Sequence, residues 1–383
     1  MNTRRLRNKL THKKFKLEIF YRMVLQNFLT LLEGAVIPLL LMGSLALVGF
    51  VLWESRHWYA AAGKIEQLNL HIQAKNEVMR TLAQVLGGAF ILTGLYFTAK
   101  NVFVSRRAQI TDRFADALEK LSDPHNMLKR IGGIHALESI ARDSPKDHWR
   151  IMEIFTNFVR ISTTNTEYLE SQNKVPLEKR KPREDIQQIL NAIGRRTRSF
   201  GIGESRPLNL TGANLHGADL QRANLEGANL QETTLSGAIL LGAHLRRADF
   251  SRANLKGANF NLADLTNVNF HQADLEHANL RNALLKKTSF AMAQMRFACF
   301  EGTKLRVVDF PNAVLDNASF EEADLKACDF AGASLKDAVL KDAKIVSPSN
   351  LTEAQITLAI TNNTTIPDCI RRPSPKGSPE RVT

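Results

Sequence analysis

This sequence is expected to form a mixed architecture: two membrane-spanning α-helices, a small α-helical module, and a stacked-repeat solenoid closed by a C-terminal capping helix. Three patterns lead to that expectation. A large apolar residue recurs at every fifth position from residue 210 to residue 345, two long segments carry no charge, and helical apolar stripes lie between those segments and the repeats. A fixed short period is typical of solenoids, in which each repeat buries its apolar residue against its neighbours.

The N-terminal part is expected to hold a basic cytoplasmic leader (residues 1–34) and a transmembrane hairpin (residues 35–99). Residues 35–53 and 82–99 contain no charged side chain, and each segment is long enough to span a bilayer. Either segment can instead be a buried core helix. The first can also be a signal peptide cleaved near Ala60-Ala61-Ala62, although its long basic leader is unlike the compact start of such peptides.

Lysine and arginine residues near the two spans predict their orientation. The leader carries eight, the 54–81 loop carries four, and the second span is followed by Lys100, Arg106, Arg107 and Arg113. Cytoplasmic flanks are enriched in such residues, so both termini are expected in the cytoplasm. The chain is therefore expected to be an integral, multi-pass protein of an inner (cytoplasmic) or thylakoid membrane. Ala83 and Gly87 permit close helix approach, either to a second copy in a homo-oligomer or to the first span.

The formal net charge of +13 is unevenly distributed. Residues 1–33 and residues 100–207 each contribute +6, whereas residues 208–346 contain 15 basic and 16 acidic side chains. The basic charge therefore lies beside the predicted membrane, where anionic lipids attract it, and a nucleic-acid partner for the repeats is disfavoured. The three cysteines, Cys299, Cys328 and Cys369, are too few and too scattered for a disulfide framework or a zinc site.

Residues 106–198 are expected to form a module of three or four amphipathic helices, with a polar linker at residues 162–182. Ser144 is the expected N-cap of the third helix, with Pro145 at its first position. The apolar stripes that predict the helices are Ile110, Phe114, Leu118 and Leu121; Ile131, Ile134, Leu137 and Ile140; Ile151, Ile154, Phe155 and Phe158; and Ile186, Ile189, Leu190 and Ile193.

Residues 208–346 contain 28 consecutive five-residue units. Because neither the helical nor the strand period divides five, the chain must turn after each unit to bury the repeated apolar residue. Reading every twentieth residue gives four columns, and Phe occurs only in the columns through Leu210 and Leu220, ten residues apart. This segregation indicates four sides per turn, with small residues such as Ala213 filling the space between the large ones.

The repeated motif is similar to that of the pentapeptide-repeat family. It is seen in Ala248-Asp249-Phe250, Ala273-Asp274-Leu275 and Ala323-Asp324-Leu325. The resemblance implies a right-handed quadrilateral β-helix of about seven coils and about 34 Å length at the usual strand spacing. The segment from Arg113 to Trp149 also resembles a region beside membrane spans in bacterial, especially cyanobacterial, members of the family, a likeness that implies no chemistry.

The open end of such a rod exposes unpaired backbone and needs a cover. Residues 347–383 are expected to supply it as a capping helix at residues 352–360, followed by a disordered tail rich in Pro, Ser and Arg. Thr352 and Gln355 fit a capping box ahead of Ile356.

No residue pattern indicates catalysis, and no cofactor or metal is expected. His135 and Glu138 lie one helical turn apart, but two ligands do not make a metal site. Gly201-Ile202-Gly203 lacks the later glycine and the strand–helix context of a phosphate loop. The chain is therefore expected to be a non-enzymatic, membrane-tethered scaffold that displays the rod to the cytoplasm.

The candidate interaction face is the fourth column, which runs from Leu225 to Ile345. Its outward positions carry eight basic residues against Glu226, Asp264 and Asp324. Such a stripe can bind membrane lipids or an acidic protein partner, or it can simply keep the rod soluble. The eight residues are Arg246, Arg247, Lys286, Lys287, Lys304, Arg306, Lys326 and Lys344.

Two other functions stay open at this point. One branch of the resembled family binds topoisomerases by mimicking DNA, and the helical module can instead transmit a signal. Mimicry requires a strongly negative rod, which the balance of 15 basic and 16 acidic residues disfavours.

Overall fold

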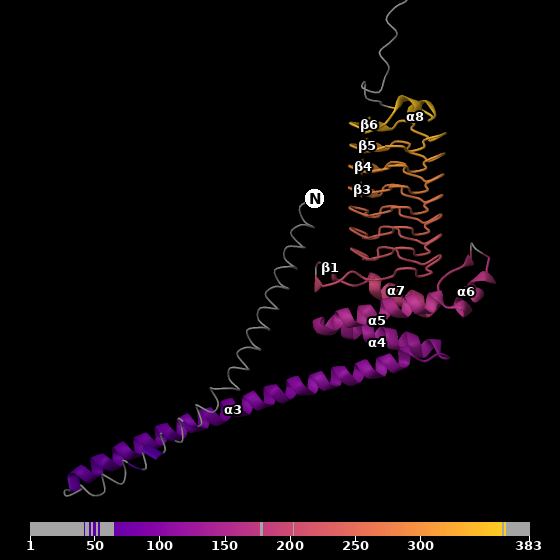
Figure 1. Cartoon of the computed structure of the whole chain (residues 1–383). Coiled ribbons are helices and arrows are strands. Elements are labelled where there is room, and N and C mark those ends of the chain that lie inside the picture. Colours follow the sequence, from indigo (N-terminus) through magenta and orange to yellow (C-terminus); the bar gives the residue numbers. More distant parts are fainter. Residues whose placement is uncertain are drawn as a thin grey trace, which may run out of the picture. The chain divides into compact units, whose positions relative to one another are not determined.

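The computed structural model describes residues 65–176, 179–201 and 203–361, together with residues 42, 46, 49, 50, 53 and 364. The chain divides into two compact units, Met1–Gln109 and Ile110–Thr383. Figure 1 shows the order of their elements. The predicted leader (1–34) and the tail from residue 365 onward lie outside the described residues, as does the predicted span 35–53 apart from five positions.

The described part of the first unit is dominated by helix α3 (Ile65–Leu121), which continues into the second unit. Of the described helices, α3 alone is long and apolar enough to cross a membrane, by length and composition. It contains the predicted span 82–99, in which Phe90 is 73% exposed and Ile91 is 66% exposed. The structure therefore contains one candidate for the two predicted spans.

The prediction of separate segments around residues 82–99 was wrong in two respects. Residues 65–81 are helical, although the sequence analysis placed them in a hairpin loop. No break separates residues 82–99 from the stripe that begins at Ile110, because residues 100–113 contain neither glycine nor proline to interrupt the helix.

The helical module consists of the end of α3 and helices α4 (Met127–Asp143), α5 (Pro145–Thr164), α6 (Thr166–Asn173) and α7 (Glu184–Gly194). Helix α4 contacts α5 and α7, and Ile134, Phe155 and Ile189 are fully buried in the core they share. Gly133 lets α4 approach α3 closely, since a Cβ atom there would lie 2.6 Å from the carbonyl oxygen of Ala117.

Two local predictions in the module need correction. The polar segment 162–182 contains the end of α5 and the whole of α6, because Asn165 accepts the N–H of Tyr168 and starts a new helix. Ser144 occupies the N-cap position of α5, as predicted, but its hydroxyl donates to the Asp147 carboxylate and does not cap a backbone N–H.

The repeats form a four-sided coil in which, from Asn209 to Asp329, the residue before each central apolar residue pairs in parallel with the residue twenty positions later. All 28 central residues are at most 3% exposed. The ring centroids of Phe250 and Phe270 stack 5.2 Å apart, and Phe260 meets both edge-on at 6.0 and 5.8 Å. The two phenylalanine columns thus meet across the core, which confirms the four-column prediction.

The helical module closes the first coil of the rod, a role that the sequence analysis did not predict. In later coils, the residue before each central residue donates its backbone N–H to a carbonyl of the preceding coil, as Asn229 does to the Leu208 carbonyl at 2.8 Å. The first coil has no predecessor, and groups from α5 and α7 accept these N–H groups instead. The three bonds are Asn214 N to Thr163 Oγ1 (3.1 Å), Asp219 N to Gln187 Oε1 (3.1 Å) and Asn224 N to the Gly194 carbonyl (2.9 Å).

The other end of the rod is covered by α8 (Glu353–Thr357), which is shorter than the predicted helix at 352–360. The predicted capping box is present, with Thr352 and Gln355 bonded reciprocally. The Gln355 amide also donates to the carbonyls of Phe330 (2.9 Å) and Ala333 (2.8 Å). This side chain therefore joins the helix cap to the last coil.

Candidate interaction face

The fourth face of the rod, defined as the outward side of the column from Leu225 to Ile345, carries a regular sheet. Its strands are β3 (Leu284–Lys286), β4 (Lys304–Arg306), β5 (Asp324–Lys326) and β6 (Lys344–Val346), paired in parallel in that order. In each strand the central residue is buried and its two neighbours project outward. Outward residues of successive coils therefore stand directly above one another.

The structure places all eight predicted basic residues at outward or corner positions of this face. Seven are exposed and Arg306 is half-buried. The strand register stacks Lys286 against Arg306, and Arg306 against Lys326, on successive coils. Like charges directly opposite one another in a sheet are destabilising, and in this column the Asp324 carboxylate, ion-paired with Arg306, offsets part of that repulsion.

Ion pairs distinguish the fourth face from the rest of the rod. Outside it, the repeats hold seven basic residues, and five of these form an ion pair with an acidic residue one coil away or on the same face. Examples are Lys341 with Glu321 (2.6 Å) and Arg252 with Glu232 (3.3 Å). On the fourth face only Arg246 and Arg306 have such a partner among the described residues, namely Asp264 and Asp324.

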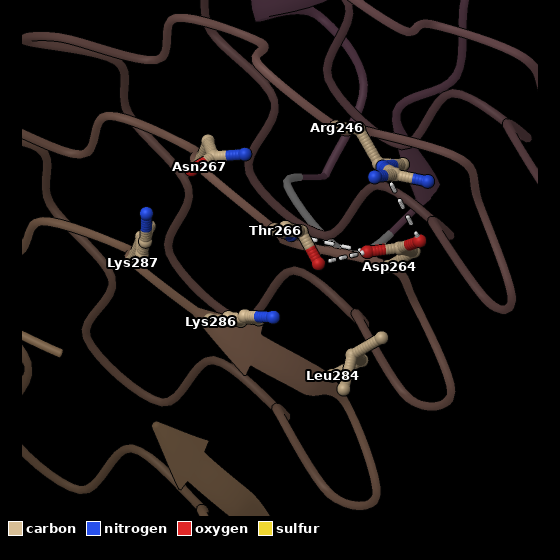
Figure 2. Close-up of a pocket in the computed structure, with 7 residues that line it drawn as sticks. All are labelled: Arg246, Asp264, Thr266, Asn267, Leu284, Lys286 and Lys287. Carbon is tan, nitrogen blue, oxygen red and sulfur yellow. Dashed lines mark hydrogen bonds and ion pairs between the residues drawn. The ribbon is translucent and has the colours of Figure 1, made fainter. Parts of the chain in front are cut away.

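A hollow lies at the beginning of this sheet, and Figure 2 shows the side chains that line it. Asp264 anchors one side, because its carboxylate accepts the backbone N–H and the hydroxyl of Thr266 and lies 3.9 Å from Arg246. Lys286 and Lys287 lie on the other side, and no acidic side chain pairs with them in the described part of the chain. The hollow thus offers positive charge beside a carboxylate that is already engaged.

Two apolar residues are exposed among the basic ones. Leu284 in β3 is 47% exposed and lines the hollow, and Val307, at the corner after β4 on the next coil, is 48% exposed. The fourth face therefore combines unpaired charge with aliphatic surface.

The other candidate groups do not form a reactive site. Glu138 is held by Arg195 through two bonds of 2.9 Å, while His135 lies 3.9 Å from it. The described residues contain no group of three side chains that could hold a metal ion. Burial raises the pKa of the Cys328 thiol to about 12, which makes it a poor nucleophile.

Sequence reasoning missed a buried ion-pair network where the module meets the rod. Glu204 Oε1 lies 3.0 Å from His148 Nε2 and 3.1 Å from Arg196 Nε, and all three residues are nearly inaccessible to solvent. Burial holds the pKa of Arg196 below its ordinary value despite the Glu204 charge. No local pattern could reveal a network whose members lie 56 and 8 residues apart.

Comparison with known proteins identifies the repeats. Eight copies of the family described as Pentapeptide repeats match this chain, at residues 209–245, 228–267, 243–282, 263–306 and 305–342. No curated protein matches the chain in sequence.

Several solved structures are similar to part of the chain. QnrB1, a plasmid-mediated fluoroquinolone resistance protein, is 17% identical over 42% of this chain and 83% of its own, with a TM-score of 0.26. HetL from Nostoc sp. strain PCC 7120 is 26% identical over 41% and 81%, with a TM-score of 0.18. Rfr23 from Cyanothece 51142 is 21% identical over 41% and 89%, with a TM-score of 0.18. At these TM-scores the likeness carries no inference about function.

Proposed function

This chain carries a pentapeptide-repeat domain at residues 209–342, and from that premise we propose that it is a non-enzymatic interaction scaffold whose fourth face binds an anionic partner. The observation that carries the proposal is the segregation of unpaired basic charge. Five of the seven basic residues elsewhere on the rod are paired, whereas six of the eight on the fourth face have no ion-pair partner among the described residues.

A rod that only needed solubility would gain nothing from leaving these charges together. Lys286, Arg306 and Lys326 follow one another at the strand spacing of about 4.8 Å, where like charges repel. A bound anionic surface offsets that repulsion, because it is attracted by the summed positive potential of the row.

The proposal includes a tether to the membrane through the two predicted spans, residues 35–53 and residues 82–99 of α3, with the rod and both termini in the cytoplasm. It is supported by the uncharged, exposed surface of residues 82–99 and by the lysine and arginine residues that follow them. The full-length chain is expected to stay in the membrane fraction after alkaline extraction. Release of the chain by alkaline extraction would contradict the membrane tether but would not bear on the binding role proposed for the fourth face.

The function is tested by crosslinking and affinity purification of the full-length chain from native membranes, with co-purified proteins and lipids both quantified. The test variant is Lys286→Glu with Lys326→Glu, two exposed residues without an ion pair among the described residues. The control is Lys336→Glu, which is also exposed and has no ion pair within the described ranges but lies on the opposite face.

Partners are expected to be lost with the double substitution and kept with the control. An identical set of partners in all three proteins would overturn the proposal. A set that also persists after deletion of residues 208–346 would move the function to the helical module or to α3.

A further inference from the structure

We infer that the fourth face docks on the surface of an anionic lipid bilayer. The inference rests on the proposed function and names the partner class for the same face. Three features of the face together favour a lipid surface over an acidic protein: its regular three-residue strands, the predominance of lysine among its unpaired cations, and the aliphatic side chains beside them.

The geometry is that of a flat strip. Strands β3 to β6 are each three residues long and pair in exact register, so the outward side chains of successive coils stand at the same height. In the other units, the residue after the central one belongs to a turn, whereas Lys286, Arg306 and Lys326 continue the strand. The strip therefore presents a plane to its partner.

Five of the six unpaired cations of the face are lysines. Lys286, Lys287, Lys304, Lys326 and Lys344 have no ion pair among the described residues, and neither does Arg247, whereas Arg246 and Arg306 are held by aspartates. Arginine suits fixed, two-pronged recognition of carboxylate or phosphate, while lysine is a mobile point charge on a flexible stem. A row of free lysines fits headgroup phosphates that move in the plane of a bilayer.

Leu284 and Val307 supply the apolar part. They are 47% and 48% exposed beside Lys286 and Arg306. Surfaces that lie on membranes combine basic side chains with aliphatic ones that enter the boundary between headgroups and acyl chains. Neither terminal segment of the chain has the negative charge that would let it bind this basic face, since residues 1–33 carry +6 and residues 347–383 also carry a net positive charge.

The test uses the full chain reconstituted in vesicles and measures how close each face of the rod lies to the bilayer. A fluorophore is attached to Leu284→Cys on the fourth face or to Gln294→Cys, half a coil further along and therefore on the opposite face. Cys299 and Cys369 are replaced by serine, and Cys328 stays because it is buried. The vesicles are phosphatidylcholine with roughly one-third phosphatidylglycerol, or phosphatidylcholine alone, with a spin-labelled headgroup as quencher.

Quenching is expected at residue 284 in the anionic vesicles only, and not at residue 294 in either. Since each basic residue contributes about fivefold at an anionic surface, Lys286→Glu with Lys326→Glu should shift the docking equilibrium by about 30-fold or more, and Lys336→Glu should leave it unchanged. Equal quenching at both sites, or no dependence on phosphatidylglycerol, would overturn the inference. If the co-purified proteins are still lost with the double substitution, the scaffold function stands and its partner is an acidic protein.

Discussion

The cap that the helical module places on the first coil leads to a quantitative prediction for Thr163→Val. Thr163 is fully buried, and its Oγ1 accepts the N–H of Asn214 at 3.1 Å while donating to the Val159 carbonyl at 2.8 Å. Valine keeps the shape of the side chain but removes the acceptor. The Asn214 N–H then loses its partner, since the first coil has no predecessor whose carbonyl could replace it.

The magnitude follows from the cost of an unsatisfied backbone donor, which is about 1–3 kcal/mol for a buried group. That free energy corresponds to about a 5- to 150-fold change in a local opening equilibrium. Later coils should feel little of it, because each coil contacts only its neighbours. The effect is therefore expected to be confined to the first coil and the adjoining end of α5.

Amide hydrogen exchange of the full-length chain in detergent micelles measures this opening directly. Peptides that contain Asn214 should exchange faster in Thr163→Val by the stated factor, and peptides around Phe290 should not change. Thr163→Ser keeps the hydroxyl and is the matched control. Unchanged exchange at Asn214 in the valine variant, or the same acceleration in the serine variant, would refute the capping role of the hydroxyl.

Three further predictions concern stability, measured as urea midpoints of the full chain. Gly217→Ala should destabilise more than Gly237→Ala, because both residues have a φ of +64° but only at Gly217 would a Cβ atom meet another group, the Arg180 carbonyl oxygen at 2.2 Å. Phe290→Ala should cost about 3–5 kcal/mol, since its ring is stacked on both sides in the core, whereas the exposed Phe297→Ala should cost far less. Although burial opposes ionisation of Asp185, Arg183 and Arg130 hold its pKa below the ordinary value. The ionised carboxylate therefore adds to the free energy of unfolding at neutral pH, and this contribution is lost as the pH falls below about 4. Asp185→Asn should flatten that loss of stability in acid.

Each of these predictions has an outcome that would count against it. Equal urea midpoints for the two glycine variants would mean that a Cβ atom at Gly217 fits beside the Arg180 carbonyl. Equal losses at the buried and the exposed phenylalanine would deny that the stacked column carries the stability of the rod. A wild-type acid transition that survives in Asp185→Asn would assign it to other carboxylates.

The rod was predictable because its information is repeated along the chain. The period of five, the twenty-residue columns and the confinement of Phe to two of them determine which residues face the core, and all 28 central residues are buried as expected. The capping box at Thr352 was equally visible, because it depends on residues three positions apart. The five-residue period and the twenty-residue columns also predict which side chains point outward, and hence which residues make up the fourth face.

The parts that were missed depend on contacts without a local pattern. The caps on the first coil join residues 51 and 32 positions apart, as Thr163 does to Asn214 and Gln187 to Asp219. Ion pairing on the rod was also hidden, since it depends on whether an acidic residue falls on the neighbouring coil. Arg306 has Asp324 beside it, and Lys326 has no such partner among the described residues. The continuity of α3 was missed because a change from apolar to charged sequence was interpreted as a boundary.

The central claim is that the rod acts through the charge of its fourth face, and site-specific photocrosslinking in native membranes tests it most directly. A photoreactive residue is placed at position 284 or at position 294 of the full-length chain, and protein and lipid adducts are identified by mass spectrometry. The account predicts adducts from position 284 that disappear with Lys286→Glu and Lys326→Glu but persist with Lys336→Glu, and few adducts from position 294. Equal adducts from both positions, unaffected by the charge reversal, would contradict it.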